Sequence, residues 1–278
     1  MKYKYGFIGI GNMGGIILDT VLKTADAKEI CACDSNKEKI DRATSLGVTS
    51  VDARTAAENS KYLFIGVKPQ GLEGLFNGIS DYINEDTVIV SMAAGKEIKT
   101  IEELCRKNTK IIRIMPNTAV GVGEGVILYC YNQNVSGEEI DGFNLALSKA
   151  GLVDFIEEGK INAATALSGC GPAFVDLFIE ALADGAVSCG LPRDKALLYA
   201  SKTVLGAAKT VIESGKSPAE LKDMVCSPGG STIQGVRALE KGKFRSAAIE
   251  AVIASYKKAE DLGEWNFYIY SKISVILF

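Results

Sequence analysis

The sequence predicts an α/β N-terminal domain with a doubly wound parallel sheet, followed by an all-α C-terminal domain. Three observations carry this prediction. Apolar runs alternate with helical patterns over residues 1–158, the first run leads directly into a glycine-rich turn, and residues 159–278 carry only helical patterns. Apolar strands that alternate with helices are typical of parallel sheets covered on both faces. We therefore expect a domain boundary at residues 158–159.

Seven apolar runs are expected to form the sheet, most of them continuous, as in strands buried on both faces. They are residues 5–10, 29–33, 62–67, 87–90, 111–115, 125–129 and 152–156. Helical patterns at residues 16–22, 37–46 and 138–149 separate some of them. These helices predict parallel strands with right-handed crossovers.

The first connection has the sequence of a dinucleotide-binding turn. Gly9, Gly11 and Gly14 form Gly-x-Gly-x-x-Gly between a strand and a helix, and Asp34 ends the next strand. Glycines in this position let the backbone approach a diphosphate, whose charge is favoured by free amides and the helix dipole. The sequence therefore predicts a Rossmann-like domain that binds NADPH or NADH.

Further cofactor contacts are expected in the loops that follow the strands, because ligands of doubly wound sheets lie outside the carboxyl ends of the strands. The expected contacts are mostly small or turn-forming residues. Besides the three glycines they are Asn12, Met13, Asp34, Ser35, Asn36, Val67, Lys68, Pro69, Ala93, Ala94, Gly95 and Asn117.

The segment after the second strand bears on the choice of cofactor. A carboxylate such as Asp34 accepts hydrogen bonds from ribose hydroxyls and disfavours a 2′-phosphate. Ser35, Asn36 and Lys37 follow directly and can hold that phosphate, while the first two can also cap the next helix. These residues favour NADH by a small margin and leave NADPH open.

Composition excludes several classes of function. The chain has no histidine, which excludes Ser–His and Cys–His nucleophile pairs and histidine metal sites, and we predict no metal. The net charge of −3 disfavours binding of nucleic acid. The seven cysteines form no Cys-x-x-Cys pair and are expected to be reduced. Because the N-terminus leads into a strand rather than a signal peptide, we expect a cytoplasmic protein with no membrane contact.

The C-terminal half is expected to hold helices at residues 172–189, 195–214, 231–240 and 244–262, with a short one after Ser217. The two long helices are apolar around most of their circumference, which predicts burial. Since five helices in one layer cannot bury them, we expect a homodimer with interleaved helices. The tail at residues 265–278 is too short to span a bilayer; it serves subunit packing or is an atypical terminus.

Two glycine-rich turns in this half precede helices. The first is Ser-Gly-Cys-Gly-Pro-Ala at residues 168–173, and the second contains Ser227, Gly229, Gly230, Ser231 and Thr232. Free amides at a helix N-terminus, with hydroxyls beside them, suit a small anion such as a carboxylate. The simpler alternative is that Ser231 or Thr232 caps the helix.

With Val67-Lys68-Pro69, Ala93-Ala94-Gly95 and the Met-Pro-Asn-Thr at residues 115–118, these turns resemble the pyrroline-5-carboxylate reductase family, up to about Leu262. The resemblance implies hydride transfer from NAD(P)H to the C=N bond of 1-pyrroline-5-carboxylate, giving L-proline in the last step of proline biosynthesis. It also implies a C-terminal dimerisation domain whose helices interlock two subunits, and a decamer in many members.

The resemblance further implies roles for the second turn. Ser231, Thr232 and the amides of Gly229 and Gly230 are expected to hold the substrate carboxylate. The hydroxyl of Thr232 is expected near the imine nitrogen, which makes Ser231 and Thr232 the candidate catalytic residues. No histidine is needed, since a cyclic imine is readily protonated and then accepts hydride; positioning and desolvation supply the acceleration.

Three departures from the family pattern and two alternatives remain. The tail after Leu262 follows no pattern of the family. Cys170 and Phe174 stand where many family members carry serine and tyrosine. One alternative is a reductase of a related cyclic imine or of a β-hydroxyacid; the hydroxyacid enzymes use a lysine on the helix at the domain junction, and residues 172–190 contain none. The other is a non-catalytic nucleotide-sensing module, which leaves the hydroxyl-rich turn unexplained.

Overall fold

The computed structural model describes the backbone of residues 1–273 and the side chains of residues 1–261. The chain divides into two compact units, which we describe separately. The sheet unit is Met1–Gly169, with which the last helix associates from Tyr256 on, and the helical unit is Cys170–Ser255. The domain boundary expected at residues 158–159 stays a prediction.

The sheet unit is built on one eight-stranded sheet with the order β3-β2-β1-β4-β5-β6-β7-β8. Its strands are β1 (Tyr3–Ile8), β2 (Ile30–Cys33), β3 (Thr49–Ser50), β4 (Ser60–Ile65), β5 (Val88–Ser91), β6 (Lys110–Pro116), β7 (Gly125–Tyr131) and β8 (Gly151–Phe155). The seven expected strands are all present and β3 adds an eighth. The first strand ends at Ile8 rather than Ile10, because Gly9 turns the chain with a φ of +88°.

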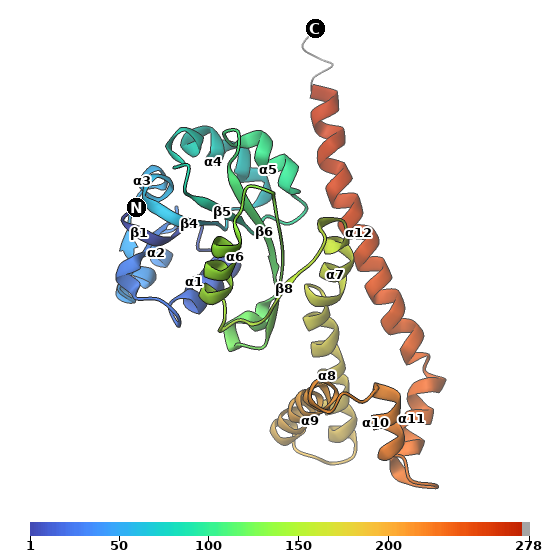
Figure 1. Cartoon of the computed structure of the whole chain (residues 1–278). Helices are drawn as coiled ribbons and strands as arrows, with labels where there is room; N and C mark the ends of the chain where they lie inside the picture. The colour runs from blue at the N-terminus through green and yellow to red at the C-terminus, as the bar shows by residue number, and fades with distance from the viewer. Residues whose placement is uncertain (274–278) are drawn as a thin grey trace. The chain divides into compact units, whose positions relative to one another are not determined.

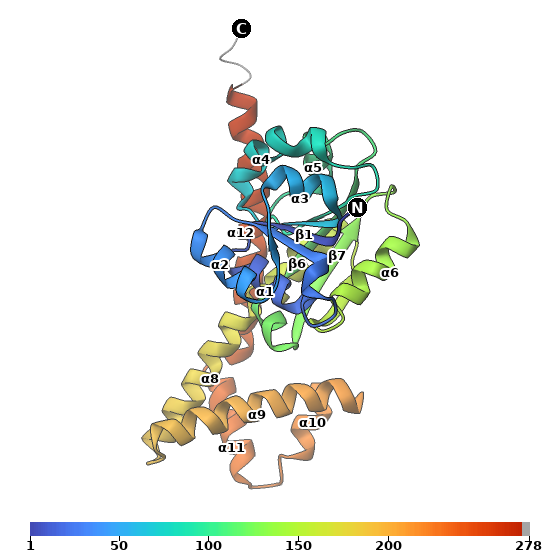
Figure 2. The ribbon, with the colours of Figure 1, turned by 90° about the vertical axis from the view of Figure 1, so that its left-hand side faces the viewer.

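Seven helices of this unit cover both faces of the sheet (Figures 1 and 2). They are α1 (Asn12–Val21), α2 (Lys37–Ser45), α3 (Ala53–Asn59), α4 (Leu72–Ile79), α5 (Ile98–Leu104), α6 (Gly137–Ala146) and α7 (Ile161–Ser168). Buried side chains of α1, α2 and α6 form one apolar core, and those of α3, α4, α5 and α7 form the other. The expected doubly wound arrangement is confirmed.

The last two strands of the sheet depart from the parallel pattern that the sequence predicts. The strands from β3 to β6 are all parallel to one another. β7 runs antiparallel to β6, and β8 is parallel to β7. The reason is the short connection: residues 117–124 hold only the 3-10 turn Thr118–Val122. A parallel crossover needs about a dozen residues or more, so this connection can only reverse the chain.

The helical unit contains α8 (Gly171–Ser188), α9 (Arg193–Ser214), α10 (Pro218–Met224), α11 (Ser231–Lys241) and the first part of α12 (Phe244–Ile273). α12 continues past Leu262, where the sequence predicted its end. The side chains of the tail at residues 265–278 lie outside the described residues, so the packing of the tail stays a prediction.

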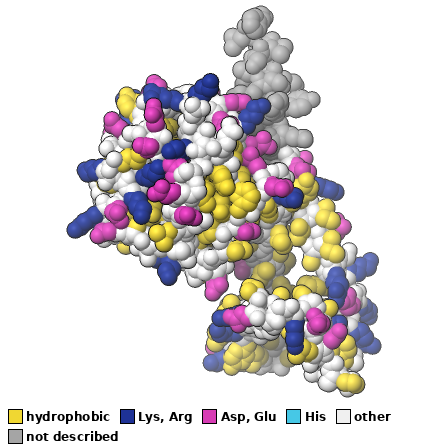
Figure 3. Space-filling model, in the orientation of Figure 1, with side chains coloured by type: hydrophobic (Ala, Val, Ile, Leu, Met, Phe, Trp, Pro, Cys, Tyr) yellow, Lys and Arg dark blue, Asp and Glu magenta, His cyan; other side chains and the backbone are white. Residues whose placement is uncertain are grey.

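The helical unit buries little of its apolar surface within one chain. α8 and α9 meet through a small core of Ala183, Ala196 and Ala200. Leu177, Leu198 and Tyr199 are more than half exposed, and hydrophobic side chains lie at the surface of this unit (Figure 3). The burial predicted for the two long helices is therefore not achieved inside one subunit.

By length and composition alone, one helical stretch of the described chain could cross a membrane. It runs over Glu158–Ser188, with a mean hydropathy of 1.4 in its most apolar window, of which 11% is buried. It comprises α7 and α8, the helices that lead from the sheet into the helical unit.

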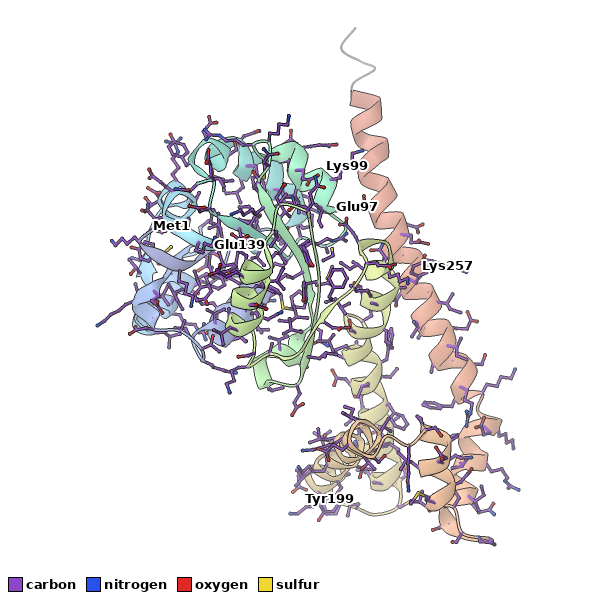
Figure 4. All side chains as sticks on the ribbon, in the orientation of Figure 1. Met1, Glu97, Lys99, Glu139, Tyr199 and Lys257 are labelled. Atoms are coloured by element: carbon purple, nitrogen blue, oxygen red, sulfur yellow. The ribbon has the colours of Figure 1, made fainter. Side chains whose placement is uncertain are left out.

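A buried ion network joins α6 to the edge of the sheet where β4 and β6 begin. Glu139, labelled in Figure 4, accepts hydrogen bonds from Lys61 Nζ at 2.6 Å and Lys110 Nζ at 2.8 Å. Its other carboxylate oxygen accepts the Ser136 amide at 2.9 Å, which completes a capping box. Burial alone would raise the pKa of Glu139, but these hydrogen bonds outweigh it and lower the pKa to about 2.

We expect this network to make folding sensitive to acid. A carboxyl whose folded pKa is depressed stabilises the protein above its unfolded pKa, and the contribution disappears as pH falls towards the folded value. Wild-type protein should therefore lose on the order of 3 kcal/mol between about pH 5 and pH 2 from this group. Glu139→Gln should have a lower Tm at pH 7 and a shallower decline of Tm over that range. Equal pH slopes for the two proteins would contradict the assignment.

Candidate active site

The loops after β1, β2, β4 and β5 begin together at one edge of the sheet. The hydrogen bonds between the strands continue one residue past the ends of β1 and β4. The Gly9 amide donates to the Cys33 carbonyl at 2.8 Å, and the Gly66 amide donates to the Ile8 carbonyl at 2.8 Å. The strand order reverses between β1 and β4, so this edge contains the topological switch point. Ligands of doubly wound sheets bind at that point.

The glycines at the switch point have two different roles. A Cβ on Gly14 or on Gly66 would lie 2.2 Å from the Gly9 carbonyl oxygen, so these glycines let α1 and β4 approach the turn. Gly9 itself needs its positive φ. A Cβ on Gly11 would meet only Lys39 Nζ, at 3.7 Å. Gly11 therefore borders open space in front of α1, whose N-terminus has no side-chain cap.

This geometry fits a dinucleotide. Uncapped amides at the start of α1 are donors for a diphosphate, and the space at Gly11 lets it reach the backbone. Asn12 and Met13 are the first two residues of α1, and the Asn12 side chain is exposed. Gly66 was not singled out from the sequence, although its place at the end of an apolar run next to the glycine turn is a usable signal.

Asp34 ties the end of β2 to the glycine turn. Its two carboxylate oxygens accept the amides of Ile10 and Asn36, each at 2.8 Å. Asn36 is the N-cap of α2 and accepts the Lys39 amide at 3.3 Å. A carboxylate has about four acceptor positions, so Asp34 still has capacity for a ribose hydroxyl.

Two lysines lie in the first turn of α2, which follows Asp34. Lys37 is exposed at the start of α2, beside the exposed Ser35. Lys39, which sequence reasoning missed, brings its ammonium group to the mouth of the Gly11 space. Helical side chains point back towards the N-terminus of their helix, and this is the signal that could have identified Lys39.

The remaining cofactor candidates line the loops after β4 and β5. Val67 packs against the core, Lys68 is exposed, and Pro69 opens a 3-10 turn. Ala93 is buried, Ala94 is exposed, and Gly95 has a φ of +71°. Pro69, Ala93, Ala94 and Gly95 are small or turn-forming, which suits an edge that accepts a flat ring.

Asn117 follows β6 and is only 8% exposed. Its Nδ2 donates to the Ser168 carbonyl at 2.9 Å, and its Oδ1 accepts the Val126 amide at 3.1 Å. Both ends of the amide are therefore engaged within the sheet unit. A direct contact of Asn117 with the cofactor stays a prediction.

The second glycine-rich turn lies in the helical unit, directly before α11. Gly229 has a φ of +71°, and the Gly230 amide donates to the Ser227 carbonyl at 3.0 Å. A Cβ on Gly230 would lie 2.5 Å from Ser227 Oγ, so the turn needs glycine there. The N-cap of α11 is Gly230, with no side-chain cap.

The hydroxyls of this turn are not used for capping. Ser231 and Thr232 are the first two residues of α11, and their side chains are exposed. Neither hydroxyl makes a hydrogen bond to any part of the chain that the structure describes. The turn thus combines free helix amides with free hydroxyls, which is an arrangement suited to a carboxylate.

Comparison with protein-family models gives two matches. Residues 158–262 match the family described as pyrroline-5-carboxylate reductase dimerisation. Residues 4–95 match the family described as NADP oxidoreductase, coenzyme F420-dependent. The matches cover the helices from α7 onward and the strands that carry the glycine turn.

Individual relatives are similar over nearly the whole chain. Pyrroline-5-carboxylate reductase 3 of Danio rerio is 40% identical over 94% of this chain and 92% of its own length. Pyrroline-5-carboxylate reductase of Escherichia coli K12 is 36% identical over 95% of this chain and 100% of its own. The crystal structure of Plasmodium falciparum pyrroline carboxylate reductase with NADP bound has a TM-score of 0.83 and 30% identity, covering 95% of this chain and 99% of that one.

Proposed function

Because this chain belongs to the pyrroline-5-carboxylate reductase family, we propose how its own residues perform the reaction of that family. The protein is an NAD(P)H-dependent oxidoreductase that reduces 1-pyrroline-5-carboxylate to L-proline, the last step of proline biosynthesis. The substrate and a proton enter with NAD(P)H, and proline leaves with NAD(P)+. When bound, the reduced nicotinamide supplies the hydride.

The sheet unit is proposed to hold the cofactor. The amides at the start of α1 and the open space at Gly11 receive the diphosphate. Asp34, Ser35 and Asn36 face the adenosine ribose, and the loops after β4 and β5 receive the nicotinamide half. This assignment is supported by the packing of Gly9, Gly14 and Gly66, which leaves space only at Gly11.

Cofactor preference is proposed to lie in the segment from Asp34 to Lys39. The Asp34 carboxylate favours the ribose hydroxyls of NADH, while Lys37 and Lys39 offer positive charge to the 2′-phosphate of NADPH. The ratio of kcat/KM for the two cofactors in the wild-type enzyme decides between them.

The turn before α11 is proposed to hold the substrate. The free amides of α11 with Ser227 and Ser231 bind the carboxylate, and the protonated imine donates its N–H to the Thr232 hydroxyl. The chain then has to orient the C=N carbon and exclude water, for which it needs no histidine. The single observation that carries this proposal is the uncapped start of α11 with two unbonded hydroxyls beside it.

We expect Thr232→Val to lower kcat/KM for 1-pyrroline-5-carboxylate by 10-fold or more, the ~1.4 kcal/mol of one hydrogen bond. The measurement is oxidation of NADH and of NADPH at several substrate concentrations. Thr210→Val is the matched control, since the Thr210 hydroxyl donates to the Gly206 carbonyl of its own helix. If wild-type protein gives no turnover with either cofactor, the function is wrong; if only the variant is unaffected, the role of Thr232 is wrong.

The helical unit is proposed to form a homodimer with interlocked helices, and five such dimers a decamer. Support comes from the exposed leucines of α8 and α9 and from a hollow of about 580 Å³ between these helices. The hollow is lined by Leu177, Ile179 and Leu197 beside Asp176 and Glu180. Helix side chains of a second subunit would fill it. We also propose that the enzyme works in the cytoplasm.

A further inference from the structure

Both ends of helix α7 are hydrogen-bonded to strand β6 or to the residue directly after it. Before its start, Glu158 Oε1 accepts Arg113 Nη1 at 2.8 Å, and Arg113 is only 3% exposed. At its end, Asn117 Nδ2 donates to the Ser168 carbonyl at 2.9 Å. Arg113 lies within β6 and Asn117 directly after it. Ile161 and Ala166 of α7 are buried between the two attachments.

The spacing of these attachments matches along the two elements. Arg113 to Asn117 spans four residues of extended chain, about 13 Å at the usual rise of a strand. Glu158 to Ser168 spans ten residues, about 15 Å at the rise of a helix. α7 is therefore held along the end of β6 at two points and cannot pivot about one of them.

Both attachments also reach the loops assigned to the cofactor. The Glu158 oxygen that binds Arg113 also accepts the amide of Ile98, the first residue of α5, at 2.8 Å. α5 follows the loop Ala93–Gly95. Asn117 itself begins the loop after β6. α7 is thus bonded both to the helix that follows one of these loops and to the first residue of the other.

We infer that Asn117 is a positioning residue for hydride transfer, acting through α7. The inference rests on the proposed function. α7 ends at Ser168, and the Gly-Cys-Gly turn at residues 169–171 then leads into α8 of the helical unit. The bond from Asn117 to Ser168 thus sets where the chain leaves the sheet unit. A displacement of about 1 Å between reacting groups can cost a hundredfold in rate.

The test compares Asn117→Asp with Asn132→Ala. Aspartate keeps the acceptor for the Val126 amide, loses the donor to Ser168 and places a carboxylate oxygen against the Ser168 carbonyl, so it breaks the attachment of α7 both by the lost bond and by repulsion. Asn132 is equally buried at 8% exposure and bonds the Thr109 carbonyl at 2.9 Å, the Glu102 carboxylate at 2.8 Å and the Ile111 amide at 3.2 Å. It is a structural asparagine near the start of β6 and provides a control for lost stability.

We expect both Asn117→Asp and Asn132→Ala to have a lower Tm than the wild-type protein. Only Asn117→Asp should also have a lower kcat, reduced at least 10-fold. The Kd for NADPH, measured by quenching of protein fluorescence, separates this role from the direct cofactor contact that the sequence predicts for Asn117: a positioning residue leaves it within twofold of the wild-type value, and a direct contact does not. The deuterium isotope effect on the transferred hydrogen should rise, since hydride transfer becomes slower than product release. Arg113→Lys, which keeps a charge for Glu158, should retain more activity than Arg113→Ala.

Two results would overturn the inference. Equal kcat values for Asn117→Asp and Asn132→Ala would reduce Asn117 to a structural residue. A weakened Kd for NADPH with an unchanged isotope effect would make it a direct cofactor contact instead. Turnover by the wild-type enzyme is measured in the same assay, so a failure of the proposed function is seen separately.

Discussion

Gly14→Ala is expected to abolish NAD(P)H binding and to destabilise the sheet unit. The new Cβ would lie 2.2 Å from the Gly9 carbonyl oxygen, and the backbone fixes the positions of both atoms, so no side-chain rotation can separate them. Overpacking of this kind costs about 1–3 kcal/mol or more. The turn at Gly9 must move to relieve it, which displaces the amides proposed to bind the diphosphate. Thermal unfolding and fluorescence titration with NADPH measure the two effects.

Gly11→Ala is the matched control in the same turn. Its Cβ would meet only the flexible end of Lys39, at 3.7 Å, so Tm should stay close to the wild-type value. The methyl group nevertheless enters the space assigned to the diphosphate, and the KM for NADPH should rise at least 10-fold. A Gly14→Ala protein with wild-type Tm, or a Gly11→Ala protein with wild-type KM, would refute the assigned roles.

Leu177→Glu is expected to convert the enzyme to an inactive monomer. Leu177 is 67% exposed in the single chain and lines the hollow between α8 and α9. If a second subunit covers it, the variant buries a carboxylate beside Asp176 and Glu180, which costs several kcal/mol. A loss of about 3 kcal/mol weakens association more than a hundredfold. Sedimentation at micromolar concentration, together with the reductase assay, measures the outcome.

The control for this variant is Leu145→Glu on α6 of the sheet unit. Leu145 is similarly exposed, at 60%, and lies outside the helical unit. It should leave both the oligomeric state and kcat unchanged. A dimer that survives Leu177→Glu would show that the exposed face of α8 is not the subunit interface.

Much of the sheet unit could be predicted because its signals are local. A continuous apolar run, a glycine turn and a helical pattern each lie within a few consecutive residues, and they identified seven strands correctly. β3, with two residues, is too short to leave a pattern. The reversal at β7 was missed because an apolar run does not encode its direction; only the short connection after Pro116 determines it.

The features of the candidate site likewise separate into local ones, which the sequence shows, and long-range ones, which it does not. Sequence alone established that glycines lie where strand meets helix and that hydroxyls lie at the start of α11, because these are properties of neighbouring residues, and its composition established that no histidine is present. The folded chain was needed to show that Gly66 packs against Gly9, that Lys39 reaches Gly11, and that Asn117 is bonded to the end of α7. Each of these pairs joins residues distant in the chain. Their approach depends on strand order and helix packing, which no single stretch of sequence contains.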